Sequence, residues 1–373
     1  MNHPEPYEDR FGEETVRYGA AGFLLSVVLR SYDGGFLFGI NRRKPIMKKF
    51  WQLWLTAVLA ALLLTACGTS DDSKKDDAST EQTGGQTAGD AEQAAPAFPV
   101  TLTDAVGNEI TFDEAPKKIV SLQASNTEIL FALGLNDEIV GVTDFDNYPE
   151  EALEKEKVGG MEFNVEQIIS MNPDVVFANE MGQSSGEEGW QQIRDAGINV
   201  FVVKNAANFD ETYGTIETIG QATGKTEEAD KIVADMKAKV EEVVAKTKDV
   251  ETKKRVFVET SDAPEIYAPG KGTFMQEMLD MIGAENVVTA DGWAMTSPEE
   301  IVKQNPDVII VMYSYVPDIV ESVKKRDGFS DITAVKEDRV IQVDENMTSR
   351  TGPRLAQGLE EVAKAIYPEA FGE

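Results

Sequence analysis

The chain has 373 residues with 66 acidic and 35 basic side chains, so its formal net charge is -31. This acidity excludes a nucleic-acid partner, because phosphate binding requires clustered Lys and Arg. The single Cys excludes an internal disulfide bond, and the single His, His3, provides no basis for an imidazole metal site or a His-dependent triad. The sequence therefore predicts no protein metal ligands and no cofactor.

Residues 1–46 contain no pattern typical of a folded domain. Their apolar run at 20–29 is too short to span a bilayer as a helix. A much more regular leader begins at Met47, so we interpret residues 1–46 as an upstream extension. A genuine cytoplasmic extension is the alternative.

Residues 47–66 have the pattern of a secretory leader. Lys48 and Lys49 form a basic start, an apolar run follows at 50–64, and the leader ends in Leu-Thr-Ala directly before Cys67. This pattern resembles the leaders of bacterial lipoproteins, which implies cleavage before Cys67 and lipidation of its thiol. Acyl chains there would hold the mature protein on a membrane surface. An uncleaved anchor is the alternative.

Residues 67–97 contain no large apolar side chain and are rich in Gly, Ser, Thr, Asp and Gln. Such a composition cannot bury enough surface to offset the entropy of the chain. We therefore predict a disordered tether that ends where the folded part begins, at Phe98.

Strand-like and helix-like segments alternate through residues 98–224 and again through residues 251–373. This alternation predicts two α/β lobes whose central parallel sheets are covered by helices. The predicted strands are 119–122, 139–143, 174–178 and 200–204, then 256–260, 307–312 and 340–343. The predicted helices are 126–134, 164–172, 187–196 and 210–222, then 273–282, 298–305, 317–326 and 353–366.

Residues 225–250 contain the clearest long helix pattern of the chain. Thr226 is placed to cap the first turn. The apolar residues recur every three or four positions and so share one face: Ala229, Ile232, Val233, Met236, Val240, Val243 and Val244. We expect this single helix to join the lobes and to permit small rotations but no large closure.

The two lobes share an internal repeat. Residues 164–178, NVEQIISMNPDVVFA, match residues 297–311, SPEEIVKQNPDVIIV, at a constant spacing. The identical pairs are Glu166 and Glu299, Ile168 and Ile301, Asn172 and Asn305, Pro173 and Pro306, Asp174 and Asp307, and Val175 and Val308. The predicted fold class is therefore α/β, with two Rossmann-like lobes joined by one long interlobe helix.

Three segments have the spacing of a helix-capping box, namely 125–128, 164–167 and 297–300. Within the last two, Glu166 and Glu299 lie in the first turn of a predicted helix, at matching places in the two lobes. Favourable interaction with the helix dipole would alone account for an acidic residue there. The alternative is that this pair of carboxylates docks on two basic pockets of a partner protein.

Ligands of parallel α/β sheets bind beyond the carboxyl ends of the strands. Aromatic and cationic residues in loops expected at those ends would form a cleft for a bulky, partly anionic ligand. For each aromatic residue a place in the core is the alternative, and Arg354 is equally suited to capping or local packing. The ligand-binding candidates are Tyr148, Phe163, Tyr267, Trp293, Tyr313, Tyr315, Arg350 and Arg354.

Residues from about 100 to 368 resemble the substrate-binding lipoproteins of ABC importers for iron-siderophores and vitamin B12. The resemblance is carried by IVSLQASNTEILFALGL at 119–135, by both repeat segments and by SRTGPRLAQGLEEVAKAIYPE at 349–369. It implies a class III periplasmic-binding-protein fold. It also implies that Glu166 and Glu299 engage arginines of the permease, that Trp293 lines the cleft and that Arg350 lies in the pocket.

The leading functional hypothesis is a lipid-anchored receptor on the extracytoplasmic face of the bacterial cell membrane. As a monomer without enzymatic activity, it would capture a ferric siderophore and deliver it to an ABC permease and its ATPase. Cobalamin or a related corrinoid is the second hypothesis, although Gly160 and Asn179 stand where B12-binding members of the family carry further tryptophans. A surface enzyme acting on glycans through Asp and Glu pairs, and a sensor partner without transport, are further alternatives.

Overall fold

The computed structural model describes residues 17–20, 23–26 and 98–372, and the chain divides into two compact units, Met1–Ala88 and Gly89–Glu373. In the first unit, β1 (Arg17–Ala20) and β2 (Phe23–Ser26) form an antiparallel pair, which the sequence pattern did not predict. The predicted signal peptide at 47–66, the tether and Cys67 lie outside the described residues, as does most of the extension at 1–46.

The N-terminal lobe of the second unit contains a parallel sheet in the order β6-β5-β7-β8. Its strands agree with the predicted segments to within two residues: β5 (Ile119–Ser121), β6 (Ile139–Gly141), β7 (Val175–Asn179) and β8 (Asn199–Val203). The helices are α1 (Ala124–Ala132), α2 (Val165–Met171), α3 (Gln183–Asp195) and α4 (Phe209–Thr223), with short 3-10 turns at Glu150–Glu154 and Glu180–Gly182.

An antiparallel hairpin of β3 (Val100–Thr103) and β4 (Glu109–Phe112) begins the N-terminal lobe. The alternation of β4 is clear, since Ile110 and Phe112 are buried while Glu109 and Thr111 are exposed. The sequence analysis missed this hairpin because a single pair of four-residue strands carries a weak periodic signal.

The C-terminal lobe contains a second parallel sheet, in the order β11-β9-β13-β14. Its strands are β9 (Arg255–Glu259), β11 (Glu285–Asn286), β13 (Val308–Val311) and β14 (Val340–Gln342). Beside it, β10 (Ile266–Pro269) and β12 (Trp293–Thr296) form a separate antiparallel ribbon. The helices are α6 (Phe274–Met281), α7 (Pro298–Gln304), α8 (Ile319–Lys324), α9 (Thr333–Lys336), α10 (Glu345–Ser349), α11 (Leu355–Ile366) and α12 (Pro368–Phe371), with a 3-10 turn at Phe329–Asp331.

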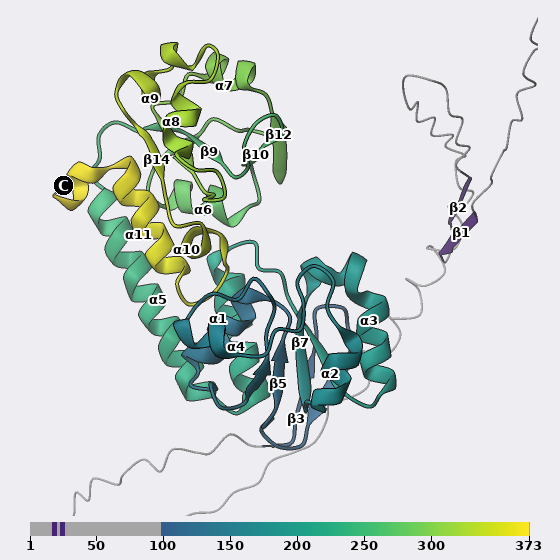
Figure 1. Ribbon diagram of the computed structural model, residues 1–373. Coiled ribbons are helices and arrows are strands. Elements are labelled where there is room, and N and C mark those ends of the chain that lie inside the picture. The colour runs from purple at the N-terminus through teal and green to yellow at the C-terminus, as the bar shows by residue number, and fades with distance from the viewer. Residues whose placement is uncertain (1–16, 21–22, 27–97, 373) are drawn as a thin grey trace, which may run out of the picture. The chain divides into compact units, whose positions relative to one another are not determined.

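The predicted connecting helix is α5 (Thr226–Thr247), and Figure 1 shows it linking the two lobes with α11 alongside it. A salt bridge of 2.7 Å joins Lys239 Nζ on α5 to Glu360 Oε2 on α11. The expected cap was wrong: Lys225 is the N-cap residue, and Thr226 makes no capping hydrogen bond. Helix α5 therefore joins the lobes with α11 packed against it, and does not stand alone.

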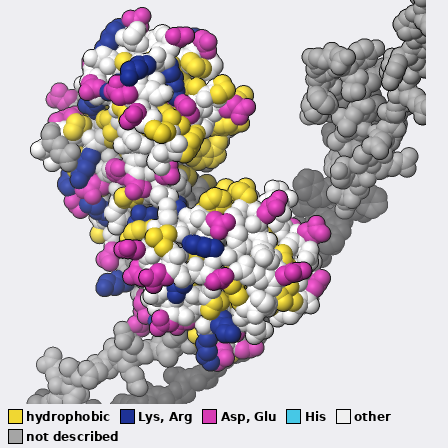
Figure 2. Space-filling model, in the orientation of Figure 1, with side chains coloured by type: hydrophobic (Ala, Val, Ile, Leu, Met, Phe, Trp, Pro, Cys, Tyr) yellow, Lys and Arg dark blue, Asp and Glu magenta, His cyan; other side chains and the backbone are white. Residues whose placement is uncertain are grey.

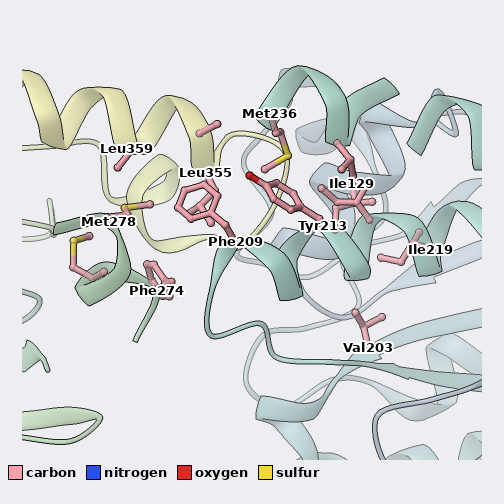
Figure 3. Packing of buried hydrophobic residues seen from close by; sticks show 14 of the residues in the cluster. Ile129, Val203, Phe209, Tyr213, Ile219, Met236, Phe274, Met278, Leu355 and Leu359 are labelled. Atoms are coloured by element: carbon pink, nitrogen blue, oxygen red, sulfur yellow. The ribbon is translucent and has the colours of Figure 1, made fainter. Parts of the chain in front are cut away.

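One of three hydrophobic clusters among the described residues runs through both lobes. It includes Phe177 from the N-terminal sheet, Met236 from α5, Val258 from the C-terminal sheet and Leu359 from α11. Figure 3 shows the middle of this cluster, where Phe209 and Leu355 lie between Tyr213 and Phe274. Because close-packed interiors resist deformation, this continuous core favours small relative movements of the lobes.

The internal repeat has the same structure in each lobe. Asn164 Oδ1 accepts from Gln167 N at 3.0 Å, and Ser297 Oγ accepts from Glu300 N at 3.3 Å, so these two predicted caps are confirmed. The predicted cap at 125–128 was wrong, because the N-cap residue of α1 is Gln123, which makes no side-chain capping hydrogen bond. Glu128 instead binds Arg350 and Arg354. None of the described helices combines the length and apolar character needed to cross a membrane.

Candidate functional site

Exposed aromatic residues follow the carboxyl ends of strands in both lobes. In the N-terminal lobe, Phe145 and Tyr148 lie in the segment after β6. In the C-terminal lobe, Tyr315 follows β13 and leaves 65% of its surface exposed. Figure 2 shows hydrophobic side chains gathered on the two lobes where they face each other, with the surface hollowed between them. This is the edge at which parallel α/β sheets bind ligands.

The β10–β12 ribbon supplies a second part of the C-terminal wall. Its register pairs Tyr267 with Met295 and Pro269 with Trp293, so these residues lie on one face of the ribbon. Tyr267, Met295 and Trp293 are exposed, and Trp293 shows 48% of its surface. The expectation that Tyr267 and Trp293 lie in loops was therefore wrong, because both are held in strands by backbone hydrogen bonds.

The Trp293 ring packs against a residue of the hydrophobic core. Its ring lies 5.9 Å from that of Phe274, at the start of α6, with an interplanar angle of 57°. A tilted ring pair at this separation is favourable and restricts rotation of the indole. The free face of Trp293 is thus presented in a fixed orientation.

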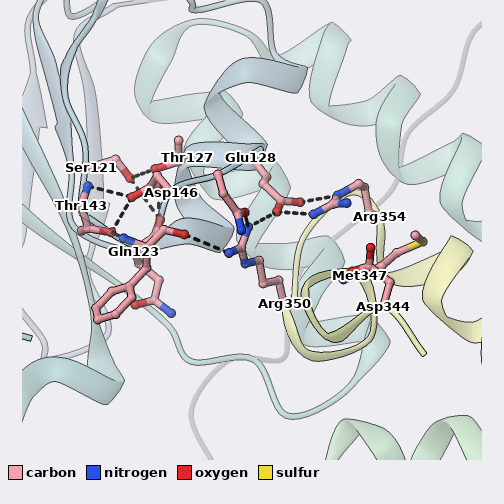
Figure 4. A network of polar contacts seen from close by, with 12 residues as sticks. Ser121, Gln123, Thr127, Glu128, Thr143, Asp146, Asp344, Met347, Arg350 and Arg354 are labelled. Carbon is pink, nitrogen blue, oxygen red and sulfur yellow. Dashed lines mark hydrogen bonds and ion pairs between the residues drawn. The ribbon is translucent and has the colours of Figure 1, made fainter. Parts of the chain in front are cut away.

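A carboxylate on α1 holds two arginines from the C-terminal segment, as Figure 4 shows. Glu128 Oε1 accepts from Arg350 Nη1 at 2.9 Å and from Arg354 Nη2 at 2.7 Å, and its Oε2 accepts from Arg354 Nε at 2.9 Å. Arg350 also donates to Asn147 Oδ1 at 2.8 Å and to the Phe145 carbonyl at 3.0 Å. We call this cluster, Glu128, Arg350 and Arg354, the arginine clamp.

The clamp changes the interpretation of both arginines. Burial opposes the charge on Arg354, but its hydrogen bonds to Glu128 outweigh that effect and raise its pKa. The Arg354 guanidinium also lies 3.7 Å from the ring centre of Tyr148, a close cation–π contact. Arg350 and Arg354 therefore fasten the C-terminal segment to the N-terminal lobe, and a ligand anion reaches Arg350 only in competition with these acceptors.

Two of the predicted aromatic ligand contacts, Tyr313 and Phe163, are not exposed. Tyr313 is only 2% exposed and donates a short hydrogen bond to Glu259, so its side chain is a buried support and not an open wall of the cleft. Phe163 is half-buried and packs closely on Gly189, where a Cβ would come within 2.8 Å of its ring. The expectation of an exposed Tyr313 was wrong, because an aromatic residue at a strand end serves the core as well as the surface, whereas Phe163 stays a proposed contact.

Glu166 and Glu299 occupy matching places in the first turns of α2 and α7, and both are exposed. The backbone N–H of Glu299 and the Ser297 side chain hold the pKa of the Glu299 carboxyl below its ordinary value. Neither carboxylate forms a salt bridge with a described residue, so both are available to a partner. Their role in docking remains a proposal.

Sequence reasoning missed the charged residues that support the site. Glu128 was assigned to a capping box, although its place inside an otherwise apolar segment could have indicated burial. Glu259, Asp262 and Arg326 were not selected, yet they form a partly buried ion cluster beside Tyr313. The only sequence signal for it was an acid, Glu259, that ends the apolar strand VFVE.

A cavity of about 170 Å³ lies in the C-terminal lobe between β12 and α7, lined by Phe257, Ala294, Thr296, Ile301 and Gln304 among others. Among the described residues, no group of three or more His, Cys, Asp and Glu side chains could hold a metal ion.

Two α/β lobes that are linked by a stiff helix and carry aromatic residues at their strand ends define a class III solute-binding protein. The family model described as periplasmic binding protein matches residues 119–347, and the chain belongs to this family.

Individual relatives agree with this assignment. The chain is 43% identical over 330 residues to the ABC transporter substrate-binding lipoprotein YvrC of Bacillus subtilis (strain 168), covering 88% of this chain and 100% of that protein. It is 28% identical to a cobalamin-binding protein of Halobacterium salinarum, covering 74% of this chain and 76% of the relative. A solved structure of a possible iron-binding periplasmic solute-binding protein from Staphylococcus epidermidis has a TM-score of 0.63 and 37% identity, covering 68% of this chain and 100% of that one.

Proposed function

We propose that this protein captures a ferric siderophore between its two aromatic walls and delivers it to a membrane permease. The chain is a substrate-binding protein of an ABC transporter, and it works outside the cytoplasm. The observation that carries the ligand proposal is the set of exposed aromatic residues at strand ends in both lobes. Such a surface suits a bulky ligand whose own oxygen or nitrogen atoms hold the metal.

Binding is reversible and includes no covalent step in this proposal. The similarity to the Staphylococcus epidermidis structure, titled as a possible iron-binding protein, supports an iron-containing ligand. Cobalamin is the second candidate, supported by the similarity to the cobalamin-binding protein of Halobacterium salinarum and by the exposed indole of Trp293. Both ligands are metal chelates, so the same two walls could accept either.

Delivery is proposed to use Glu166 and Glu299. Each carboxylate stands at the start of a helix anchored on its own lobe, which fixes the spacing between the two charges. Arginines of the permease would pair with them, because guanidinium and carboxylate groups match in geometry and charge. Lipidation of Cys67 would keep the protein at the membrane that holds the permease and its ATPase.

The ligand is tested by absorbance titration of the purified folded part, residues 98–373, kept together as one unit. Ferric complexes of a tris-catecholate and a tris-hydroxamate siderophore, and cyanocobalamin, are added separately. Saturable binding of a ferric siderophore with no response to cyanocobalamin supports the first candidate, and the reverse result supports the second. Binding of none of the three would refute the proposed function.

A further inference from the structure

A partly buried ion cluster of Glu259, Asp262 and Arg326 contacts Tyr313 and Tyr315, and Tyr315 is the most exposed aromatic residue of the C-terminal wall. Glu259 ends β9 and is fully buried, and the Arg326 side chain is 10% exposed. Arg326 donates to both carboxylate oxygens of Glu259 at 2.7 Å and to Asp262 Oδ1 at 2.7 Å. Burying charges is costly unless they are paired and hydrogen-bonded, so this cluster needs a reason beyond filling space.

The cluster holds Tyr313 in place. The Tyr313 hydroxyl donates to Glu259, and the Tyr313 carbonyl accepts from Gln342 Nε2 at 2.7 Å. Burial, followed by the hydrogen bond to the negative charge of Glu259, raises the pKa of Tyr313, so the phenol stays protonated and remains a donor. Burial opposes the charge of Arg326, but Glu259 outweighs it and keeps the guanidinium ionised. These contacts hold the Tyr313 ring in one orientation, so that a second ring can pack on it.

The Tyr315 ring stacks on the Tyr313 ring, and the Tyr315 hydroxyl forms a hydrogen bond at its far end. The centres of the Tyr313 and Tyr315 rings are 5.0 Å apart, and the angle between the ring planes is 30°. The Tyr315 hydroxyl oxygen accepts from Asp262 N at 2.9 Å, on the loop that Arg326 fixes through the Asp262 carboxylate. Its own proton is taken by no acceptor in the part of the chain described here. Tyr315 therefore presents an exposed ring, held by contacts at both ends, together with an O–H group that can donate to a ligand.

We propose that Tyr315 is a specificity-determining stacking platform for a flat conjugated ring of the ligand, and that Arg326 and Glu259 are its positioning residues. This inference rests on the proposed function and narrows its ligand to chelates that carry such a ring. The ring can belong to a catecholate arm or to a corrin macrocycle, since both offer a π face and a nearby acceptor. A pre-positioned aromatic binds with little loss of conformational entropy, which is why rigid support increases selectivity.

The test compares Tyr315→Leu, Tyr315→Phe and Arg326→Gln with the unaltered protein in the titrations described above. Tyr315→Leu is expected to weaken the ring-bearing probe by about tenfold and to leave the ring-free tris-hydroxamate unchanged. Tyr315→Phe keeps the ring and should lose about threefold through the missing hydroxyl. Leu153→Ala, at an exposed apolar residue outside the site, is the matched control and should bind every probe normally.

Arg326 acts through Tyr315 in this proposal, so its substitution should lower the preference for ring-bearing probes and have no additional effect in a Tyr315→Leu background. Should Arg326→Gln fail to fold, Tyr313→Phe removes only the hydroxyl that contacts Glu259 and tests the same support. Equal losses for ringed and ring-free probes, or unchanged binding in Tyr315→Leu, would overturn the platform while leaving the proposed function intact. Failure of the unaltered protein to bind any probe would remove both.

Discussion

The two copies of the internal repeat, residues 164–174 and 297–307, differ in what leads into them. Each has a polar N-cap, an exposed first-turn glutamate, a fully buried isoleucine and an asparagine that ends the helix with a positive φ, 49° at Asn172 and 46° at Asn305. The segment before α2 is a loop in which Gly159 adopts a φ of 108°. The segment before α7 is a strand, β12.

The two copies therefore share the start of the helix but differ in the segment that precedes it. The helix starts, where Glu166 and Glu299 lie, are alike in both lobes. The segments that precede them carry the exposed residues Met161 on a loop and Met295 on a strand. One repeated unit therefore provides matching helix starts with different segments before them, and substitutions at matching positions can test what each copy contributes.

The largest effect is expected for Glu166→Ala combined with Glu299→Ala. Ligand affinity should be unchanged, because the two carboxylates lie in the first turns of α2 and α7 and not among the proposed aromatic contacts, whereas uptake should fall by about a hundredfold or more as two charge pairs with the permease are lost. Uptake of the bound chelate into cells or proteoliposomes measures this. Glu227→Ala, at an exposed first-turn glutamate of α5, is the matched control. Unchanged uptake by the double variant would contradict the docking role.

Asp174 and Asp307 should contribute unequally to stability. Asp174 Oδ2 accepts from the backbone N–H groups of Lys117 and Lys118, at 2.7 and 2.9 Å, whereas Asp307 Oδ2 accepts from Arg255 N alone, at 2.8 Å. Substitution by Ala should cost about 3 kcal/mol at Asp174 and about 2 kcal/mol at Asp307 in the free energy of unfolding, measured with urea. The exposed Asp113→Ala serves as control, and a larger loss at Asp307 would reverse the comparison.

Asn172→Gly and Asn305→Gly separate backbone strain from side-chain bonding. Glycine tolerates a positive φ, so relief of strain should leave Asn172→Gly within about 0.5 kcal/mol of the parent protein. Asn305 Oδ1 also accepts from Thr333 N at 2.8 Å, so Asn305→Gly should cost about 1 kcal/mol. Thermal or urea unfolding measures both. Equal effects would show that the link to Thr333 contributes nothing.

The smallest effect concerns the acidity of Glu299. Its pKa is lowered by its own backbone N–H and by Ser297, so this carboxylate adds stability above the ordinary pKa of a glutamate and loses it as the pH falls through the lowered value. Ser297→Ala should raise the pKa of Glu299 towards its ordinary value, as followed by an NMR titration of the side-chain carboxyl. A pKa that stays unchanged in this variant would exclude Ser297 as a cause.

Most of the secondary structure could be predicted because its signals are local. The parallel strands are short apolar runs, and α5 has a regular apolar stripe, so both were located to within a few residues. The ribbon of β10 and β12 was missed because its strands pair across more than twenty residues, and a four-residue strand has too few alternations to stand out. The sequence also indicated which aromatic residues follow strands, yet it could not distinguish the buried Tyr313 and the half-buried Phe163 from the exposed ones.

The sequence by itself determined the α/β class, the two lobes, the helix between them and the twin glutamates, since hydrophobic periodicity and a repeated motif are properties of neighbouring residues. Only the tertiary structure decided that Glu128 binds Arg350 and Arg354, and that Glu259 and Arg326 bind each other and contact Tyr313. These partners lie far apart along the chain, and a charge reveals its counter-charge only when folding removes both from water.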